Sequence, residues 1–196
     1  LLALALLVAA CAPVVSPDTP RPLVAVINGP GEERPTQATA ELVQERIEEV
    51  PGCCTFSFMR SAPLRFQETH RNLFGSRAVP NAAALARNLT VDHAVLVGLP
   101  IFEREVDEYR TEIDVAGEVQ LRAQLIGAQS GEVLATVPSR VFRGSRTQSA
   151  DEDMPDEGFD PLMLELIDRA AADVAPHLAA LLEDVAVEWR AAQAGE

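Results

Sequence analysis

The stretch Val91-Asp-His-Ala-Val-Leu-Val-Gly-Leu-Pro-Ile-Phe102 decides the fold of this chain. After His93 it is an almost unbroken apolar run with a glycine inside it, and polar residues flank it. Such a run is too short for a membrane span and is typical of a strand that is covered on both faces. Helical patterns before and after it are expected to supply the two covers. The sequence therefore predicts an α/β (α+β) domain with a mixed sheet of about five strands.

The segments before this strand alternate between strand and helix patterns. Short strands are predicted over 23–27 and 54–59, and helices are predicted over 36–50, 63–74 and 81–89, from the spacing of their apolar residues. Strand and helix in alternation favour parallel neighbouring strands joined by right-handed crossovers.

The segments after this strand predict an antiparallel addition to the sheet. Residues 113–125 alternate between apolar and polar, and we expect them to pair with the run 132–143 as a long hairpin. The charged segment 103–112 is expected to be the turn between the central strand and this hairpin. Asp160 and Pro161 begin a long helix with a continuous apolar stripe, which is expected to lie across one face of the sheet.

The N-terminal segment resembles the signal of a bacterial lipoprotein. Residues 1–10 are apolar and end in Leu7-Val-Ala-Ala-Cys11, which is similar to a lipobox. The resemblance implies that removal of residues 1–10 leaves Cys11 as the lipidated first residue; a plain signal peptide with a chance cysteine is the alternative. Residues 11–22 then form the lipidated cysteine and a proline-rich tether. A single domain is expected over 23–192, at the periplasmic face of the outer membrane.

The charge of the chain limits its partners. The sequence has 16 Lys and Arg against 30 Asp and Glu, a net charge of -14, and every basic residue is an arginine. Phosphate backbones repel such a chain, so nucleic acid is not an expected partner. A membrane is expected to hold it only through the lipid on Cys11. The lack of lysine excludes Schiff-base and P-loop chemistry.

No catalytic motif accompanies these elements in the sequence. The turn at 28–31 lacks the lysine and the third glycine of a phosphate loop, and its proline has no N–H. The histidines His70, His93 and His177 are scattered, and neither His-Glu-x-x-His nor Gly-x-Ser-x-Gly occurs. We therefore expect no enzyme, no cofactor and no metal site.

Cys53 and Cys54 are adjacent and lie outside any Cys-x-x-Cys frame. Adjacent Cα atoms lie nearer to each other than is usual for a disulfide, so a bond between these two is not expected. Packing of Cys54 in the core is favoured, and an intermolecular disulfide through Cys53 is the alternative.

Two charged segments are expected at the surface. The acidic loop 145–159 lacks the spacing of an EF-hand, which favours a solvated loop over a calcium site. The segment 103–112 carries an aromatic residue among its charges. We expect Glu105, Tyr109 and Arg110 in this segment to contact a partner protein.

The run Ala82–Gly98 resembles a helix-strand signature, "LA..LGADYVLVG". It is shared by the curli-secretion lipoprotein (CsgG-like), the penicillin-binding-protein activator lipoproteins (LpoB-like) and the amino-terminal domain of the periplasmic protein TolB. The strand Val24–Ile27, the turn Ser130–Leu134 and the terminal helix follow in the matching order, so the resemblance spans about residues 23–182. This chain has Thr90-Val-Asp-His93 where the family has Gly-Ala-Asp-Tyr. The resemblance implies an envelope lipoprotein that works through protein contacts and not by catalysis.

These observations leave three functions to compare. The first is a lipid-anchored adapter or activator that binds envelope proteins, the second is a subunit of a curli-type secretion pore, and the third is an enzyme. A pore subunit needs additional strands that face lipid, and the hairpin that starts at 113–125 is already required for the core. The adapter is therefore the expected function, with its oligomeric state left open.

Overall fold

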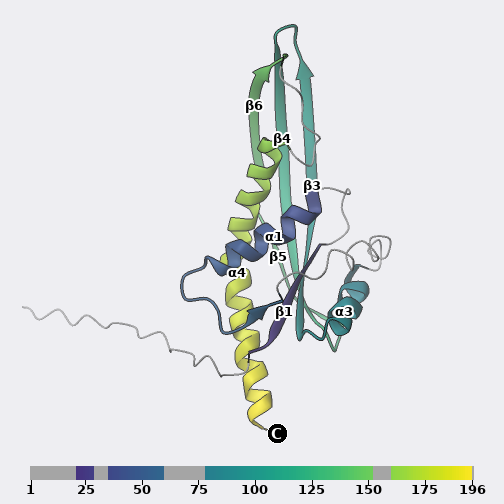
Figure 1. The fold of residues 1–196 in the computed structure, drawn as a ribbon, viewed down its shortest axis with the longest axis vertical. Coiled ribbons are helices and arrows are strands. Elements are labelled where there is room, and N and C mark those ends of the chain that lie inside the picture. The colour runs from purple at the N-terminus through teal and green to yellow at the C-terminus, as the bar shows by residue number, and fades with distance from the viewer. Residues whose placement is uncertain (1–20, 29–34, 60–77, 152–159, 196) are drawn as a thin grey trace, which may run out of the picture.

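The computed structural model describes residues 21–28, 35–59, 78–151 and 160–195. In this part of the chain a six-stranded mixed sheet carries three helices, which confirms the predicted α+β class (Figure 1). The elements are β1 (Leu23–Asn28), α1 (Pro35–Glu48), β2 (Ser57–Phe58), α3 (Ala78–Asn88), β3 (His93–Glu108), β4 (Glu112–Gly127), β5 (Val133–Pro138), β6 (Phe142–Ser149) and α4 (Pro161–Ala194).

The sheet joins a parallel half to an antiparallel half. Its strand order is β2-β1-β3-β4-β5, and β6 also pairs with β4. β1 is parallel to both β2 and β3, while β3, β5 and β6 are all antiparallel to β4. The parallel pairing of β1 with β3 is the one that the strand-helix alternation predicts.

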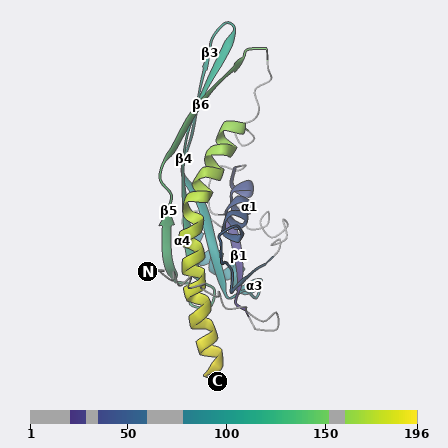
Figure 2. The ribbon, with the colours of Figure 1, turned by 90° about the vertical axis from the view of Figure 1, so that its left-hand side faces the viewer.

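The apolar part of β3 is covered on both faces, as the sequence predicts. Val95 and Val97 are buried in a core with α1 and α4, while Ala94 and Leu96 are buried in a second core with α3. We call the face toward α1 and α4 the inner face of the sheet and the opposite face the outer face. Figure 2 shows α1 and α4 on the same side of the strands.

The segment 103–112 is not a turn, and this prediction is wrong. Residues 103–108 continue β3, which pairs with β4 as far as Glu108 opposite Ile113. The turn is confined to 109–111, and the N–H of Tyr109 donates to the carbonyl oxygen of Glu112 at 2.8 Å. Residues 103–108 still alternate between the two faces of the sheet, as a strand requires. Their many charged side chains conceal this alternation in the sequence.

A β-bulge in β3 sets which side chains reach the outer face. Gly98 lies opposite Arg122 and Ile101 lies opposite Gln120, so β3 carries an extra residue between these two pairs. Before the bulge the even-numbered side chains of β3 lie on the outer face, and after it the odd-numbered ones do. The bulge therefore turns Glu103, Glu105 and Asp107 away from α4.

The partner of β4 after residue 127 is split in two. β5 pairs with the lower part of β4, from Ile126 to Arg122, and β6 pairs with its upper part, from Val119 to Glu112. The antiparallel pairing predicted for 132–143 is confirmed, but as two strands and not as one continuous run. The acidic loop predicted from residue 145 begins later, because β6 extends to Ser149. Ser139 separates the two strands and is held by β4, since its hydroxyl accepts from the N–H of Leu121 at 2.9 Å.

Two further predictions change or are not tested. The strand predicted over 54–59 is reduced to Ser57–Phe58 at the edge of the sheet, although Phe56 is buried. The helix predicted over 63–74 and most of the acidic loop lie outside the described residues.

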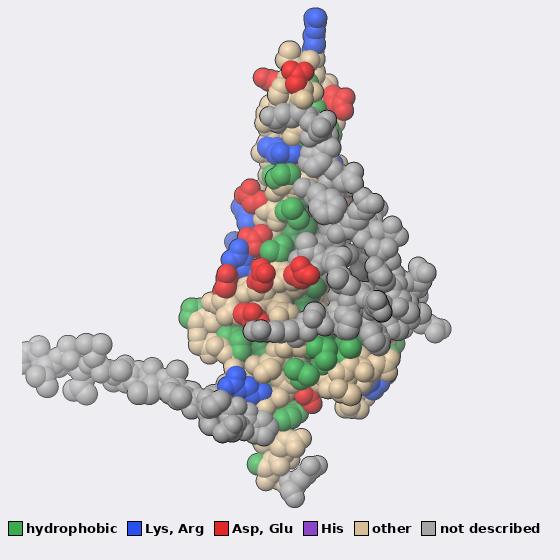
Figure 3. Space-filling model, in the orientation of Figure 1, with side chains coloured by type: hydrophobic (Ala, Val, Ile, Leu, Met, Phe, Trp, Pro, Cys, Tyr) green, Lys and Arg blue, Asp and Glu red, His purple; other side chains and the backbone are tan. Residues whose placement is uncertain are grey.

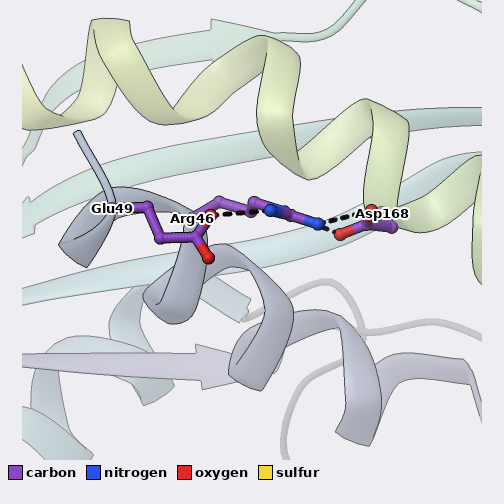
Figure 4. Close-up of polar contacts among 3 residues, drawn as sticks. All are labelled: Arg46, Glu49 and Asp168. Carbon is purple, nitrogen blue, oxygen red and sulfur yellow. Dashed lines mark hydrogen bonds and ion pairs between the residues drawn. The ribbon is translucent and has the colours of Figure 1, made fainter.

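α4 begins where the sequence predicts. Asp160 is its N-cap and accepts from the N–H of Leu162 at 2.9 Å, and Pro161 follows at the first position. A bidentate pair fixes α1 to α4, since Arg46 donates from Nε and Nη2 to the two carboxylate oxygens of Asp168 at 2.8 and 2.7 Å (Figure 4). Hydrogen bonds to Asp168 and then to Glu49 raise the pKa of Arg46. None of the described helices is both long and apolar enough to cross a membrane.

Candidate interaction surface

The upper parts of β3, β4 and β6 form a projection that we call the arm, made of residues 101–108, 112–120 and 142–149 (Figure 1). In the arm β3 pairs with β4 alone among the described strands, because β1 ends opposite Val97. The strand β3 has 16 residues, which corresponds to about 50 Å at about 3.3 Å per residue. The free end of the arm therefore lies far from the point where the chain enters the domain.

The outer face of the arm is acidic. The register places Glu103 opposite Glu118 and Asp107 opposite Asp114, with Glu105 between these rows. All of these side chains are exposed except Glu118, which is half-buried. Figure 3, which looks onto the helix side, shows acidic side chains also at the free end of the arm.

The acidic side chains surround a shallow hollow. Its volume is about 430 Å³, and Glu103, Glu105, Glu118 and Arg143 line it together with the backbone of Gly117. The lining residues come from β3, β4 and β6 and include none from α4, so the hollow opens on the outer face. A hollow of this kind is suited to receive side chains of another protein.

The charges of this face are only partly neutralised. Arg143 donates from Nε and Nη2 to Glu118 at 2.7 and 2.8 Å, and this hydrogen bonding lowers the pKa of the Glu118 carboxyl. Within the described residues the carboxylates of Glu103, Glu105 and Asp107 have neither a hydrogen bond nor an ion pair. These three unpaired carboxylates leave the outer face with a negative charge.

On the inner face, the arm is attached to the start of α4 by a buried ion cluster. Asp160 is fully buried, and its Oδ2 lies 3.1 Å from Nη2 of Arg104 and 3.3 Å from Nη2 of Arg146. The side chain of Arg104 is only 10% exposed. The cluster pairs Arg104 and Arg146 with Asp160 on the inner face, so these two arginines do not reduce the negative charge of the outer face.

Two glycines allow the close contact between the arm and α4. A Cβ added at Gly117 would lie 2.6 Å from Sδ of Met163, and one at Gly144 would lie 2.9 Å from Cδ1 of Leu162. At these distances a side chain would fit only if Met163 or Leu162 moved aside. The arm is therefore packed on α4 along its length up to Asp160 and is not a free loop.

The structure places the three predicted contact residues on the arm or in the turn at its free end. Glu105 lies on the outer face beside the hollow, while Tyr109 and Arg110 lie in the turn at the free end, where Tyr109 is 60% exposed. Sequence reasoning missed Glu103 and Glu118. The alternation of Phe102, Arg104 and Val106 with acidic residues is a strand pattern that could have revealed them. Cys11 lies outside the described residues.

The expectation that Cys53 and Cys54 do not bond to each other is wrong, whereas the predicted packing of Cys54 against the core is confirmed. The structure joins Cys53 and Cys54 to each other by a disulfide, so neither is a free core thiol or a partner for a second chain. Both residues are half-buried and pack against the core of α1 and α4.

Neither a protein-family model nor a curated protein matches the sequence. Solved structures similar to this chain include bacterial lipoproteins. Lipoprotein GNA1162 from Neisseria meningitidis is 10% identical, with a TM-score of 0.42 over 80% of this chain and 99% of that chain. The LpoB C-terminal domain from Escherichia coli is 14% identical, with a TM-score of 0.34 over 65% of this chain and 83% of that chain.

A dodecameric PelC from Paraburkholderia phytofirmans is also similar, at 11% identity and a TM-score of 0.39 over 79% of this chain and 88% of that chain. Similarities at these identities and scores carry no conclusion about activity. The CsgG-like and TolB-like parts of the resemblance stay predictions.

Proposed function

We propose that this protein is a non-enzymatic adapter or activator of the bacterial cell envelope. A lipid on Cys11 holds it at the periplasmic face of the outer membrane, and it acts by binding another envelope protein. The observation that carries the proposal is the outer face of the arm, where the unpaired carboxylates of Glu103 and Glu105 line a hollow and that of Asp107 lies further along the same strand. A surface with this charge is complementary to a basic protein surface.

The position of the arm supports the same function. The N–H of Leu23, at the end of the tether, donates to Asp92 at the base of β3, whereas the acidic face lies toward the other end of that strand. The strand contributes about 50 Å, and the ten residues 13–22 of the predicted tether would add about 30 Å as a polyproline II chain. The arm can therefore reach a partner well away from the lipid anchor.

A second explanation of the acidic residues needs to be separated from this one. Charged side chains on an unpaired strand edge also prevent aggregation with other chains. Reversal of the charge distinguishes the two, because arginine protects an edge as well as glutamate does but does not bind a basic partner.

The experiment is site-specific photo-crosslinking in intact cells, with the cross-linker at position 107. We expect a discrete cross-linked partner, lost in the double variant Glu103→Arg/Glu105→Arg and kept in the control Glu165→Arg, which reverses an exposed charge on α4. A cross-link that survives the double reversal, or is lost equally in the control, contradicts the proposal.

The mass of the lipidated protein in mild detergent tests the pore alternative. An adapter is expected to have the same small mass by light scattering with and without the change Cys11→Ala. A large closed ring that requires the anchor would instead support the pore subunit.

A further inference from the structure

A second group of polar side chains lies where the turn after α1 meets α4, on the inner side of the sheet. It consists of Cys53, Cys54 and Glu183. Their two sulfurs and a carboxylate oxygen lie within 4.8 Å of one another, and all three residues are half-buried. The site does not overlap with the acidic face of the arm and has no part in the proposed contact.

Neighbouring groups hold the carboxylate in place. The N–H of Thr55 donates to Oε1 of Glu183 at 2.8 Å, and the hydroxyl of Thr55 donates to Oε2. Arg190 in turn donates to that hydroxyl oxygen at 3.3 Å. Each carboxylate oxygen can accept a hydrogen bond and retain a lone pair for a metal ion. Hydrogen bonds that orient a ligand in this way are typical of metal sites.

We propose that the reduced form of this protein binds a soft divalent cation, Zn²⁺ or Cd²⁺, through Cys53, Cys54 and Glu183. Two thiolates and a carboxylate are ligands that zinc accepts, with water in the fourth position. The thiolates disfavour calcium and magnesium, which prefer ligand sets made of oxygen.

The oxidation state of the cysteines controls access to the site. In the structure the two sulfurs are bonded to each other. A dithiol reductant transfers two electrons and two protons to this bond, giving two thiols, and is itself oxidised to a disulfide. Binding of the cation then releases the two thiol protons. The same pair of sulfurs therefore forms either a disulfide or a metal site.

The test uses the full chain with Cys11→Ala, so that the remaining thiols are Cys53 and Cys54. The protein is reduced with a phosphine, which does not bind as a thiol would, and is titrated with Cd²⁺ while the thiolate-to-metal charge-transfer absorption is recorded. We expect saturation at one equivalent, displacement by Zn²⁺ and release of two protons per ion. The unreduced protein is expected to give no such band.

Single variants assign the ligands. Cys53→Ser and Cys54→Ser are each expected to remove the charge-transfer band at one equivalent, while circular dichroism verifies that the variants are folded. Glu183→Gln still accepts from Thr55 and is expected to weaken binding by about tenfold or more. The control Glu188→Gln, at an exposed position of the same helix, is expected to bind like the parent.

Three results would overturn this proposal. They are a reduced protein without the band, a band that survives Cys53→Ser, and equal affinities of Glu183→Gln and Glu188→Gln. None of these results bears on the contact surface of the arm, because its test measures a different property at different residues.

Discussion

Replacement of Asp160 by alanine is expected to be one of the most destabilising single changes in this domain. Asp160 caps α4 and is also the shared anionic partner of Arg104 and Arg146 on the inner face of the arm. The change removes the cap and leaves the Arg104 guanidinium, which is 10% exposed, without its counter-charge.

The magnitude follows from these two losses. Loss of a helix N-cap costs about 1 kcal/mol. Removal of one partner from a buried ion pair costs about 3–5 kcal/mol, because the remaining charge stays desolvated. The losses share a side chain and are not fully additive, so we expect the free energy of unfolding to fall by about 4 kcal/mol. Domains of this size are stable by about 5–15 kcal/mol, which makes the change measurable.

Urea unfolding measures this quantity, and two variants separate its parts. Asp160→Asn keeps a good capping group and is expected to recover the capping contribution of about 1 kcal/mol. The double variant Asp160→Asn/Arg104→Met is expected to recover most of the remaining loss at Arg104, because an apolar side chain leaves no buried charge there. The control is Asp173→Ala, which breaks a pair with the exposed Arg140 and is expected to cost no more than about 1 kcal/mol. A loss for Asp160→Ala equal to that of the control would refute the reasoning.

Two further changes test the packing of the sheet. Gly117→Val is expected to lower the free energy of unfolding by about 1–3 kcal/mol in a urea titration, because the new side chain would overlap Met163. The control Ala116→Val, on the outer face, should have little effect. Equal effects of the two changes would contradict the assigned faces. Burial lowers the pKa of His93, so below a pH of about 6.5 the unfolded chain gains a proton that the folded chain does not, and the free energy of unfolding falls as the pH decreases toward 5. His93→Gln should make this decrease shallower, and an unchanged pH profile would be evidence against the half-buried position of His93.

The parts of the fold that the sequence predicts well are those that depend on local pattern. The apolar run at 94–97, the alternation of β4 and the cap of α4 each depend on residues close together in the chain. The extent of β3 is not predicted, because the predicted strand ends at Phe102 and the charged residues beyond it are assigned to a turn, whereas β3 continues to Glu108.

The candidate sites depend on contacts between distant segments, which no local pattern contains. Glu118 meets Arg143 because of the register of β6 on β4, and Asp160 meets Arg104 because α4 starts beside that row of the sheet. The pairing of Thr55 with Glu183 likewise needs the packing of α4 near the turn that follows α1. Residue types alone could indicate an acidic surface but not which acids remain unpaired.

The bulge in β3 connects the fold to the proposed contact. An acidic strand packed directly on α4 would have to bury its carboxylates, at a cost that few partners could offset. The extra residue between Gly98 and Ile101 places Arg104 and Val106 on the inner face instead, where Arg104 pairs with Asp160. The carboxylates of Glu103 and Glu105 are then presented from a strand that is fixed on a helix. Because the backbone that carries these charges is held in place before binding, the arm loses little backbone conformational entropy when a basic partner docks there, and the association should slow as salt screens the face.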